Sequence, residues 1–279
     1  LKQLGVRVFL NSRVQSLLVE DGAVRGAVLQ SGERIAADRV IVCTGGMSYP
    51  STGSTGDGYA LLRACGHTIV EPRPALIPLT CDASWVKELQ GLSLKNVRLT
   101  LTRGKKTLYT ELGEMLFTHF GVSGPLALSA SSYLTALDPR ECELKLDLKP
   151  ALSEQQLDAR ILRDVGEAGR KQVSTVLCGL YPQRLAETMA ALCEIDGRKP
   201  ANELKREERE LLVKRTKALV LPVTGPLPID AAIITCGGAS VKEFAPATME
   251  SKRVGGLYAA GELVDIDALT GGFNLQIAF

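Results

Sequence analysis

The residues best suited to chemistry gather near the end of this 279-residue chain, in the stretch Gly255–Gln276. A short apolar run, Leu257–Ala260, predicts a buried strand that stops at Gly261 and Glu262. After an acidic loop, the pair Gly271-Gly272 predicts the start of a helix. A carboxylate in such a turn can accept hydrogen bonds from sugar-like hydroxyls, and the free N–H groups of a helix start face electron-rich groups. This pattern indicates a cofactor with a polyol and an electron-rich ring.

A second glycine-rich segment follows the apolar run Arg39–Thr44, which predicts a fully buried parallel strand. The run ends in Gly45-Gly46, and the hydroxyl-rich loop Ser48–Gly58 then leads to a helix expected from about Tyr59 to Cys65. The loop lacks the Lys-Ser/Thr ending of a Walker phosphate loop, and the chain contains no G-x-G-x-x-G sequence. Two interpretations stay open for both segments: a cofactor site, or tight packing with Ser and Thr caps at a helix start.

The composition narrows the class of protein. An apolar content of 45%, a charged content of 23% and a formal net charge of +2 are ordinary for a globular domain. The near-neutral charge argues against a nucleic-acid partner, and no run of about 20 apolar residues predicts a membrane span. The seven cysteines are odd in number and form no C-x-x-C pair. They predict reduced thiols in a cytoplasmic protein, without a disulfide framework or a metal site.

The elements predicted before the glycine-rich loop are strands. Residues Val6–Leu10 predict one strand, and Val14–Val19, Ala23–Gln30 and Arg34–Ala36 predict a meander in which Asp21-Gly22 is the clearest turn. The sequence at each end of the chain, the first at Leu1–Leu4, has the pattern of part of a helix. We therefore expect this chain to be part of a longer protein.

The middle of the chain changes from strands to helices. Prolines between Pro72 and Pro78 predict a domain crossing. Antiparallel strands are then expected at Leu76–Cys81, Ser93–Arg103, Lys106–Tyr109 and Cys142–Leu148, and a helix capped by Ser123 is expected to begin at Pro125. Helices follow from Ser153, which forms a predicted capping box with Gln156, through a second at Pro182 to a third at Arg206–Leu219. Strands return at Ala218–Val223 and at Asp230–Thr235, where Gly237-Gly238 closes the last one.

This order of elements predicts an α/β fold with β-barrel-like and helical insertions, arranged as nested, discontinuous domains. The two outer pieces can then pair in one sheet. The predicted boundaries are a partial cofactor-binding domain at 1–74 and 237–279, a β-barrel-like domain at 75–150 and 219–236, and a helical insertion at 151–218.

Several motifs, spread over most of the chain, occur together in a fixed order: Thr44–Gly58, Phe117–Pro125, Thr235–Gly238, Pro246–Lys252, Gly261–Asp267 and Gly271–Gln276. With them the chain resembles the aminoacetone-oxidase-like, FAD-dependent flavoproteins, a bacterial group often labelled NAD(P)/FAD-dependent oxidoreductases that includes a flavoprotein of bile-acid operons. The resemblance implies a glutathione-reductase-like FAD domain that carries the barrel-like and helical domains. The family's N-terminal βαβ unit is not in this chain, so we expect this chain alone to bind FAD weakly or not at all.

The resemblance also implies a role for each matching position. Arg13 and Val14 would meet the adenine, and Gly261 and Glu262 would hold the pyrophosphate and ribityl region with Asp267 near by. The remaining cofactor-binding positions would be Thr44, Gly45 and Gly46 under the ADP portion, Ser51, Thr52, Gly53, Ser54 and Thr55 along the flavin, and Gly271, Gly272, Phe273 and Asn274, whose N–H groups would face the flavin N1 and C2 carbonyl.

The implied function is an FAD-dependent oxidoreductase, reduced by NAD(P)H, that acts on a small organic substrate. His119 is the histidine in a motif loop and could protonate or orient the substrate, although a lone histidine is more often structural. We predict a structural role for His67, which follows Gly66 at a helix end. Two alternatives stay open: a tRNA-modifying FAD protein and a non-catalytic flavin-binding protein.

Overall fold

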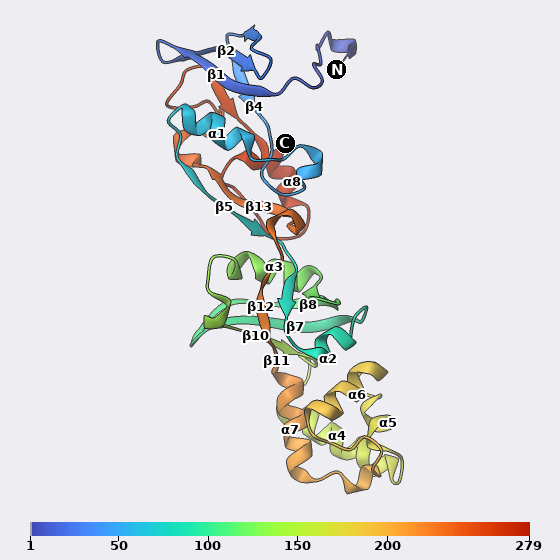
Figure 1. The fold of residues 1–279 in the computed structure, drawn as a ribbon. Helices are drawn as coiled ribbons and strands as arrows, with labels where there is room; N and C mark the ends of the chain where they lie inside the picture. Colours follow the sequence, from blue (N-terminus) through green and yellow to red (C-terminus); the bar gives the residue numbers. More distant parts are fainter. Residues whose placement is uncertain (1) are drawn as a thin grey trace. The chain divides into compact units, whose positions relative to one another are not determined.

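The structure, a computed structural model, describes residues 2–279 and divides into two compact units (Figure 1). Unit 1 comprises the chain up to Ala75 together with Pro228–Phe279, and unit 2 comprises Leu76–Leu227. The first residue of the predicted helix at Leu1–Leu4 lies outside the described residues, and a short 3-10 turn covers Lys2–Leu4.

The N-terminal part of unit 1 is a three-stranded antiparallel meander. Its strands are β1 (Val14–Glu20), β2 (Ala23–Leu29) and β3 (Arg34–Ala36), which confirms the predicted meander. Asp21 and Gly22 have φ values of 49° and 74°, as the central residues of a type I′ hairpin turn require. The meander therefore follows from local turn chemistry.

A parallel pair of strands joins the two ends of unit 1. Strand β4 (Val40–Val42) pairs with β14 (Leu257–Ala259), which confirms the parallel strand predicted after Arg39. The prediction that this strand is fully buried was wrong, because the side chain of Ile41 is 64% exposed.

The strand predicted at Val6–Leu10 was also wrong. The segment has no regular structure, and the side chains of Val6 and Leu10 are 45% and 79% exposed. A strand is stable only when its backbone N–H and C=O groups find a partner, and no strand among residues 2–279 pairs with this segment.

A second pair in unit 1 is antiparallel: β5 (Ile69–Ala75) against β13 (Ile234–Ala239). Strand β5 contains Pro72 and Pro74, two of the prolines that predicted a domain crossing, which is possible because it is an edge strand. Strand β13 continues through Gly237 and Gly238, which were wrongly predicted to end it. A Cβ atom on Gly237 would lie 2.6 Å from the carbonyl oxygen of Glu71, so the two strands approach too closely for a side chain there.

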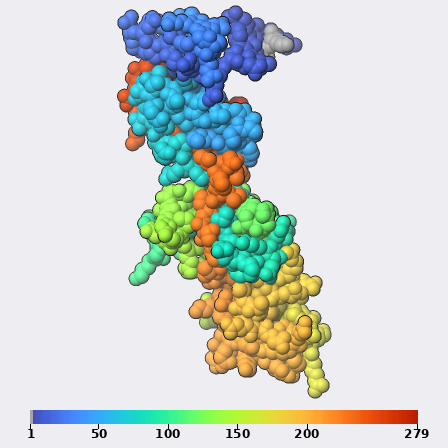
Figure 2. All heavy atoms as spheres, in the orientation of Figure 1, coloured from blue at the N-terminus to red at the C-terminus, as the bar shows by residue number. Residues whose placement is uncertain are grey.

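The helical elements of unit 1 are short. Helix α1 (Asp57–Ala64) follows the glycine-rich loop, and α8 (Phe273–Ala278) begins after Gly272, as predicted. Besides Lys2–Leu4, the described 3-10 turns of this unit are Pro50–Thr52, Ile229–Ala231, Val241–Glu243 and Gly261–Leu263. Its core combines residues from both ends of the chain, for example Leu62 and Phe244, and the corresponding cyan and orange-red parts lie together in Figure 2.

Unit 2 is built on a seven-stranded antiparallel sheet in the order β11-β10-β7-β8-β9-β6-β12. The bounds are β6 (Leu79–Cys81), β7 (Ser93–Arg103), β8 (Lys106–Phe117), β9 (Gly121–Ser123), β10 (Cys142–Asp147), β11 (Leu219–Leu221) and β12 (Val223–Pro226). The two edge strands, β11 and β12, are separated in sequence only by Pro222. The sheet therefore curves until its edges meet at that residue, but no ladder among the described residues closes it into a barrel.

Two helices flank this sheet. Helix α3 (Pro125–Leu134) begins at the predicted proline, but the predicted cap was wrong: Ser123 lies in β9, and Gly124 precedes the helix without a side-chain cap. Helix α2 (Ser84–Glu88) had no predicted counterpart, because five residues are too few to show a helical repeat. The 3-10 turn Pro139–Glu141 leads into β10.

Four helices follow β10: α4 (Glu154–Ala168), α5 (Val173–Leu177), α6 (Gln183–Leu192) and α7 (Arg206–Lys217), with a 3-10 turn at Ala201–Glu203. The predicted capping box is confirmed: Gln156 N donates to Ser153 Oγ at 3.2 Å, and Ser153 N donates to Gln156 Oε1 at 2.9 Å. Buried residues of these helices and of the sheet form one continuous hydrophobic core.

Candidate functional site

One carboxylate oxygen of Glu262 joins three segments of unit 1. Ser48 Oγ donates to Glu262 Oε1 at 2.9 Å, and the backbone N–H of Thr235 donates to the same oxygen. Glu262 follows β14, Ser48 follows β4, and Thr235 lies in β13. Because β4 and β14 are parallel, the segments after them leave the same edge of the sheet, which is where α/β folds bind ligands. The two glycine-rich segments singled out in the sequence therefore meet.

Thr235 fixes the loop after β4. Its Oγ1 accepts hydrogen bonds from the backbone N–H groups of Met47 at 2.7 Å and Ser48 at 3.0 Å. A Cβ atom on Gly46 would lie 2.7 Å from Thr235 Cβ, so only glycine fits at that position. Thr235 belongs to the motif Thr235–Gly238, for which no role was predicted. The signal that could have identified it was a threonine directly before Cys-Gly-Gly at the end of an apolar run.

The hydroxyl groups of the glycine-rich loop do not cap the helix that follows. Helix α1 begins at Asp57 after Gly56, which has a φ of 83° and provides no side-chain cap. The alternative interpretation, a loop whose Ser and Thr residues serve as helix caps, is therefore wrong for this helix. Five of the predicted cofactor-binding residues lie in the loop: Ser54 is half-buried, and Ser51, Thr52, Gly53 and Thr55 are exposed.

Buried polar atoms without a partner lie in this region. Four buried side-chain atoms among residues 2–279 make no hydrogen bond: Thr44 Oγ1, the Tyr59 hydroxyl and Arg73 Nε in unit 1, and Arg215 Nε in unit 2. Burial, and then the charges of Glu262 and Asp265, raise the pKa of Tyr59 to about 12. Burial and the charge of Asp267 also raise the pKa of Asp265. Since buried polar groups are normally hydrogen-bonded, the atoms in unit 1 fit a site that a polar ligand or water completes.

Asp267, predicted to stand near the cofactor, lies beside Cys236. Burial raises the pKa of the Cys236 thiol most, and the charge of Asp267 and a hydrogen bond with it raise it further, whereas Arg73 lowers it. The thiol is therefore kept protonated and resembles neither a nucleophile nor a redox partner.

Helix α8 presents its start to solvent. Gly271 and Gly272 have φ values of 123° and 84°, which favour glycine, and both are exposed. The Asn274 side chain accepts from Ala268 N at 2.8 Å and donates to Ala268 O at 2.7 Å, so it fixes the loop before the helix. Phe273 is 56% exposed. The backbone N–H groups predicted to face the flavin thus lie at an accessible helix start, and α8 contacts the turn that contains Glu262.

Arg13 is tied to the start of α1. Its Nε and Nη2 donate to the two carboxylate oxygens of Asp57 at 2.8 and 2.7 Å, and this pairing lowers the pKa of Asp57. A cavity of about 130 Å³ lies beside Arg13, with Gln30 and Glu33 also in its wall. Val14, half-buried at the start of β1, directly follows Arg13.

His119 belongs to unit 2. It is exposed in the connection between β8 and β9 of unit 2, and its ring contacts that of Phe120 edge-on at 4.9 Å. All the predicted cofactor-binding residues lie in unit 1.

His67 follows the C-terminal end of α1, where its backbone N–H donates to Leu62 O at 3.0 Å, and it has the predicted structural role. Its side chain is fully buried, Nδ1 lies 3.1 Å from Glu243 Oε2, Nε2 lies 2.9 Å from Ser251 Oγ, and the ring stacks on Phe244 at 4.7 Å. The order Ser251, His67, Glu243 resembles a hydrolase triad. However, Ser251 Oγ also accepts from two backbone N–H groups, those of Arg253 and Val254, and serves the turn that it begins.

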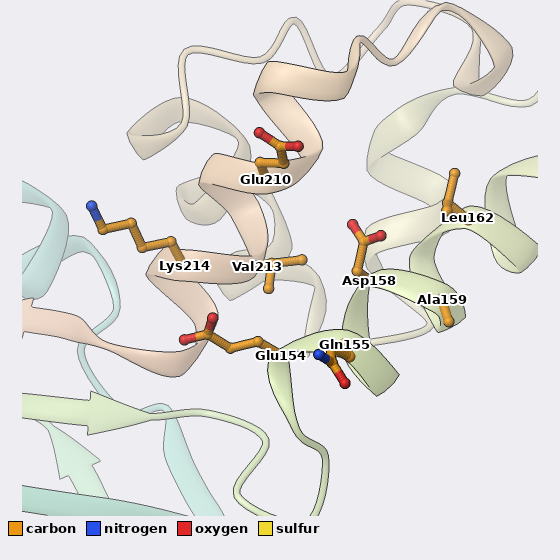
Figure 3. A pocket seen from close by; sticks show the side chains of 8 residues that line it. All are labelled: Glu154, Gln155, Asp158, Ala159, Leu162, Glu210, Val213 and Lys214. Atoms are coloured by element: carbon orange, nitrogen blue, oxygen red, sulfur yellow. The ribbon is translucent and has the colours of Figure 1, made fainter.

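A cavity of about 590 Å³ lies between α4 and α7 in unit 2 (Figure 3). Its wall contains none of the predicted site residues. Two of its carboxylates are paired with neighbouring arginines: Asp158 with Arg209 at 2.6 Å and Glu210 with Arg206 at 2.7 Å. These two carboxylates are therefore already paired and are not free to bind a charged ligand.

The described part of the chain, residues 2–279, contains neither a metal-ion cluster nor a membrane-spanning helix. No group of three or more His, Cys, Asp or Glu residues there is arranged to hold a metal ion. No helix in residues 2–279 is both long and apolar enough to cross a membrane.

Comparison with known proteins gives one family and several relatives. Residues 73–234 match the family profile described as "HI0933-like protein barrel and H2TH domain". The chain is 30% identical over 282 residues to a "3-dehydro-bile acid delta(4,6)-reductase" of Clostridium scindens, covering 100% of this chain and 68% of that protein. It is 30% identical over 279 residues to a "Ribosomal RNA dihydrouridine synthase" of Haemophilus influenzae, covering 99% and 66%, and 29% identical over 251 residues to the protein of that name in Escherichia coli, covering 89% and 60%.

The chain thus spans about two thirds of the length of these relatives. Their names are those of a reductase and of RNA-modifying enzymes, whereas the sequence resembled aminoacetone-oxidase-like proteins. The family profile covers more than half of the chain. The chain belongs to the HI0933-like family.

Proposed function

We propose that this protein is an FAD-dependent oxidoreductase whose cofactor is held in unit 1. The observation that carries the proposal is the meeting of the loop after β4 and the turn after β14 at Glu262. Both segments are glycine-rich, and both follow parallel strands at one edge of the sheet. This is the usual position of a nucleotide-type cofactor in an α/β fold.

The residues present fit FAD. The Ser48 hydroxyl and the Thr235 N–H both donate to Glu262 Oε1, which leaves Oε2 to accept a hydrogen bond from a polyol hydroxyl. Thr44 Oγ1 and the Tyr59 hydroxyl are buried without partners in the same unit. The N–H groups of Phe273 and Asn274 at the start of α8 can donate to an electron-rich ring edge. FAD supplies two-electron transfer when bound, and NAD(P)H is the proposed reductant.

The names of the relatives suggest a substrate class. A delta(4,6)-reductase and a dihydrouridine synthase are both named for the addition of hydrogen across carbon–carbon double bonds. We therefore propose that this protein reduces a carbon–carbon double bond conjugated to a carbonyl in a small organic substrate. Each reduction adds two electrons and two protons: NAD(P)H supplies a hydride equivalent and becomes NAD(P)⁺, and the second proton comes from solvent or an acidic side chain.

His119 is a candidate for the residue that orients the substrate or delivers this proton, because an imidazole can hold a proton near neutral pH. Its exposed position leaves the ring accessible to a substrate.

Modification of RNA is the second candidate. Two relatives named as ribosomal RNA dihydrouridine synthases favour it. The net charge of +2 and the pairing of basic side chains in unit 2, such as Lys199 with Glu208 at 2.5 Å, favour a small substrate. An RNA partner requires a binding constant that falls steeply with salt concentration, because phosphate contacts release counterions.

The experiment reduces the intact protein anaerobically with NADH or NADPH and then adds acceptors in parallel: cyclic enones of increasing size, and uridine-containing RNA. Faster reoxidation by an enone, with the saturated ketone as product, supports the proposal. Reoxidation by RNA with dihydrouridine as product favours the second candidate. A flavin that is reduced but reacts with neither acceptor contradicts both and favours a non-catalytic flavin-binding protein.

A further inference from the structure

We propose that Ser48 and Thr235 are positioning residues that hold the Glu262 carboxylate so that its second oxygen faces the polyol chain of FAD. The inference rests on the proposed function and extends it to residues that do not themselves touch the cofactor.

The two carboxylate oxygens of Glu262 have unequal surroundings. Oε1 accepts from the Ser48 hydroxyl at 2.9 Å and from the backbone N–H of Thr235. Neither of these two donors contacts Oε2. Two donors on one oxygen fix the plane and direction of the carboxylate. A glutamate side chain without these donors would lose rotational entropy when it binds a ligand. The Glu262 side chain has already lost this entropy on folding.

Thr235 connects Glu262 to the rest of the site. The residue is 1% exposed, and its hydroxyl oxygen accepts from both Met47 N and Ser48 N. The same residue therefore positions the backbone that carries Ser48 and donates its own N–H to Glu262. A shift of Thr235 would move both donors of the carboxylate together.

Gly46 allows this arrangement. A Cβ atom at this position would overlap with the Thr235 side chain and would lie 3.1 Å from Glu262 Oε1. The absence of a side chain lets the loop after β4 approach Thr235 and Glu262 at the same time.

A buried polar group without a partner indicates that the contacts of Ser48 and Thr235 with Glu262 serve ligand binding as well as stability. The Tyr59 hydroxyl is buried, has no partner, and interacts electrostatically with Glu262. A purely structural cluster in a folded core normally satisfies its polar atoms within itself.

The test is a double-mutant cycle in the intact protein. The variants are Ser48→Ala, Glu262→Ala and the double variant, and the readouts are the FAD dissociation constant by fluorescence titration and the thermal unfolding midpoint. Ser48→Ala is expected to weaken FAD binding about tenfold in the wild-type background and to have no further effect in the Glu262→Ala background, because Ser48 acts through Glu262.

Thr235 is tested with two substitutions. Thr235→Ser keeps the accepting hydroxyl and is expected to hold the FAD dissociation constant within about threefold, whereas Thr235→Val removes the acceptor and is expected to weaken binding by more than about tenfold. Thr68→Val is the control, since its hydroxyl donates to Glu243 in the same unit, and it is expected to leave FAD binding unchanged.

Two results separate the possible failures. If Ser48→Ala weakens binding by the same factor with and without Glu262, or has no effect in a wild-type protein that binds FAD, the inference is overturned and the proposed function stands. If the wild-type intact protein does not bind FAD, the proposed function fails, and the inference fails with it.

Discussion

Gly46 and Thr235 approach so closely that a Cβ atom on the glycine would lie 2.7 Å from the threonine Cβ. This contact predicts that Gly46→Ala destabilises unit 1 by about 1–3 kcal/mol, the usual effect of extra volume in a packed region. Because the contact lies within unit 1, hydrogen exchange followed by mass spectrometry should show faster exchange in peptides of unit 1 and unchanged exchange in unit 2.

Gly166→Ala is the matched control. This glycine lies within α4, and a Cβ atom there would meet no other atom within 4 Å. The substitution should stabilise unit 2 by about 0.5–1 kcal/mol because alanine favours the helix. Equal effects of the two substitutions would contradict the close approach at Gly46.

His67 makes the stability of unit 1 dependent on pH. Burial lowers the pKa of His67, opposed by Glu243, and Arg253 lowers it further. The folded state therefore binds fewer protons than the unfolded state, so the stabilisation is fully present above the ordinary histidine pKa of 6.5 and is lost as pH falls below it. The slope should approach at most about 1.4 kcal/mol per pH unit, from one proton.

Chemical denaturation of the wild type and of His67→Gln between pH 8 and pH 5 checks this prediction. Glutamine cannot be protonated, so the variant should be less stable at pH 8 and should vary less with pH. Glu243, whose pKa Arg253 lowers to about 2, contributes a separate loss of stability below its ordinary pKa of 4.5. An unchanged pH dependence in His67→Gln would rule out His67 as the source.

Ser153 caps α4 and supports unit 2. Ser153→Ala removes the acceptor for Gln156 N and should lower the free energy of unfolding of unit 2 by about 1 kcal/mol. Ser153→Thr keeps the hydroxyl and should recover most of this loss. FAD binding should be unchanged in both variants, since the predicted cofactor residues belong to unit 1.

These elements show what local sequence signals can predict. The meander of β1 to β3 follows from the Asp21-Gly22 turn, and α4 follows from a capping box within four residues. The failures depend on partners. Val6–Leu10 has the apolar residues of a strand, but no strand among residues 2–279 pairs with it. Strand β5 was not predicted because its prolines disfavour a strand, and they are tolerated there because β5 lies at an edge.

The segments that form the candidate site could be predicted from the sequence, but the contacts between them could not. Glycine pairs and hydroxyl-rich loops after apolar runs identified both glycine-rich segments. The contact between Ser48 and Glu262 spans 214 positions and depends on how β4, β13 and β14 come together. No local pattern shows which hydroxyl reaches which carboxylate, so the roles of Ser48 and Thr235 needed the structure.

His119→Asn tests whether His119, which belongs to unit 2, takes part in the reaction. Asparagine keeps a similar size and a hydrogen-bonding group but cannot transfer a proton near neutral pH. We expect the turnover number with an enone acceptor to fall about 10²-fold or more, with an unchanged FAD dissociation constant and an unchanged rate of reduction by NAD(P)H. An unchanged turnover number would leave His119 with a structural role only.

The most direct test of the central claim is an FAD titration of the intact protein by isothermal titration calorimetry, comparing the wild type with Glu262→Ala and Asp158→Asn. Asp158 lines the separate cavity between α4 and α7 and serves as the control. Wild type and Asp158→Asn should bind one FAD per chain with the same affinity, and Glu262→Ala should bind at least about tenfold more weakly. Equal affinity in Glu262→Ala, or no binding of FAD by the wild type, would contradict the claim.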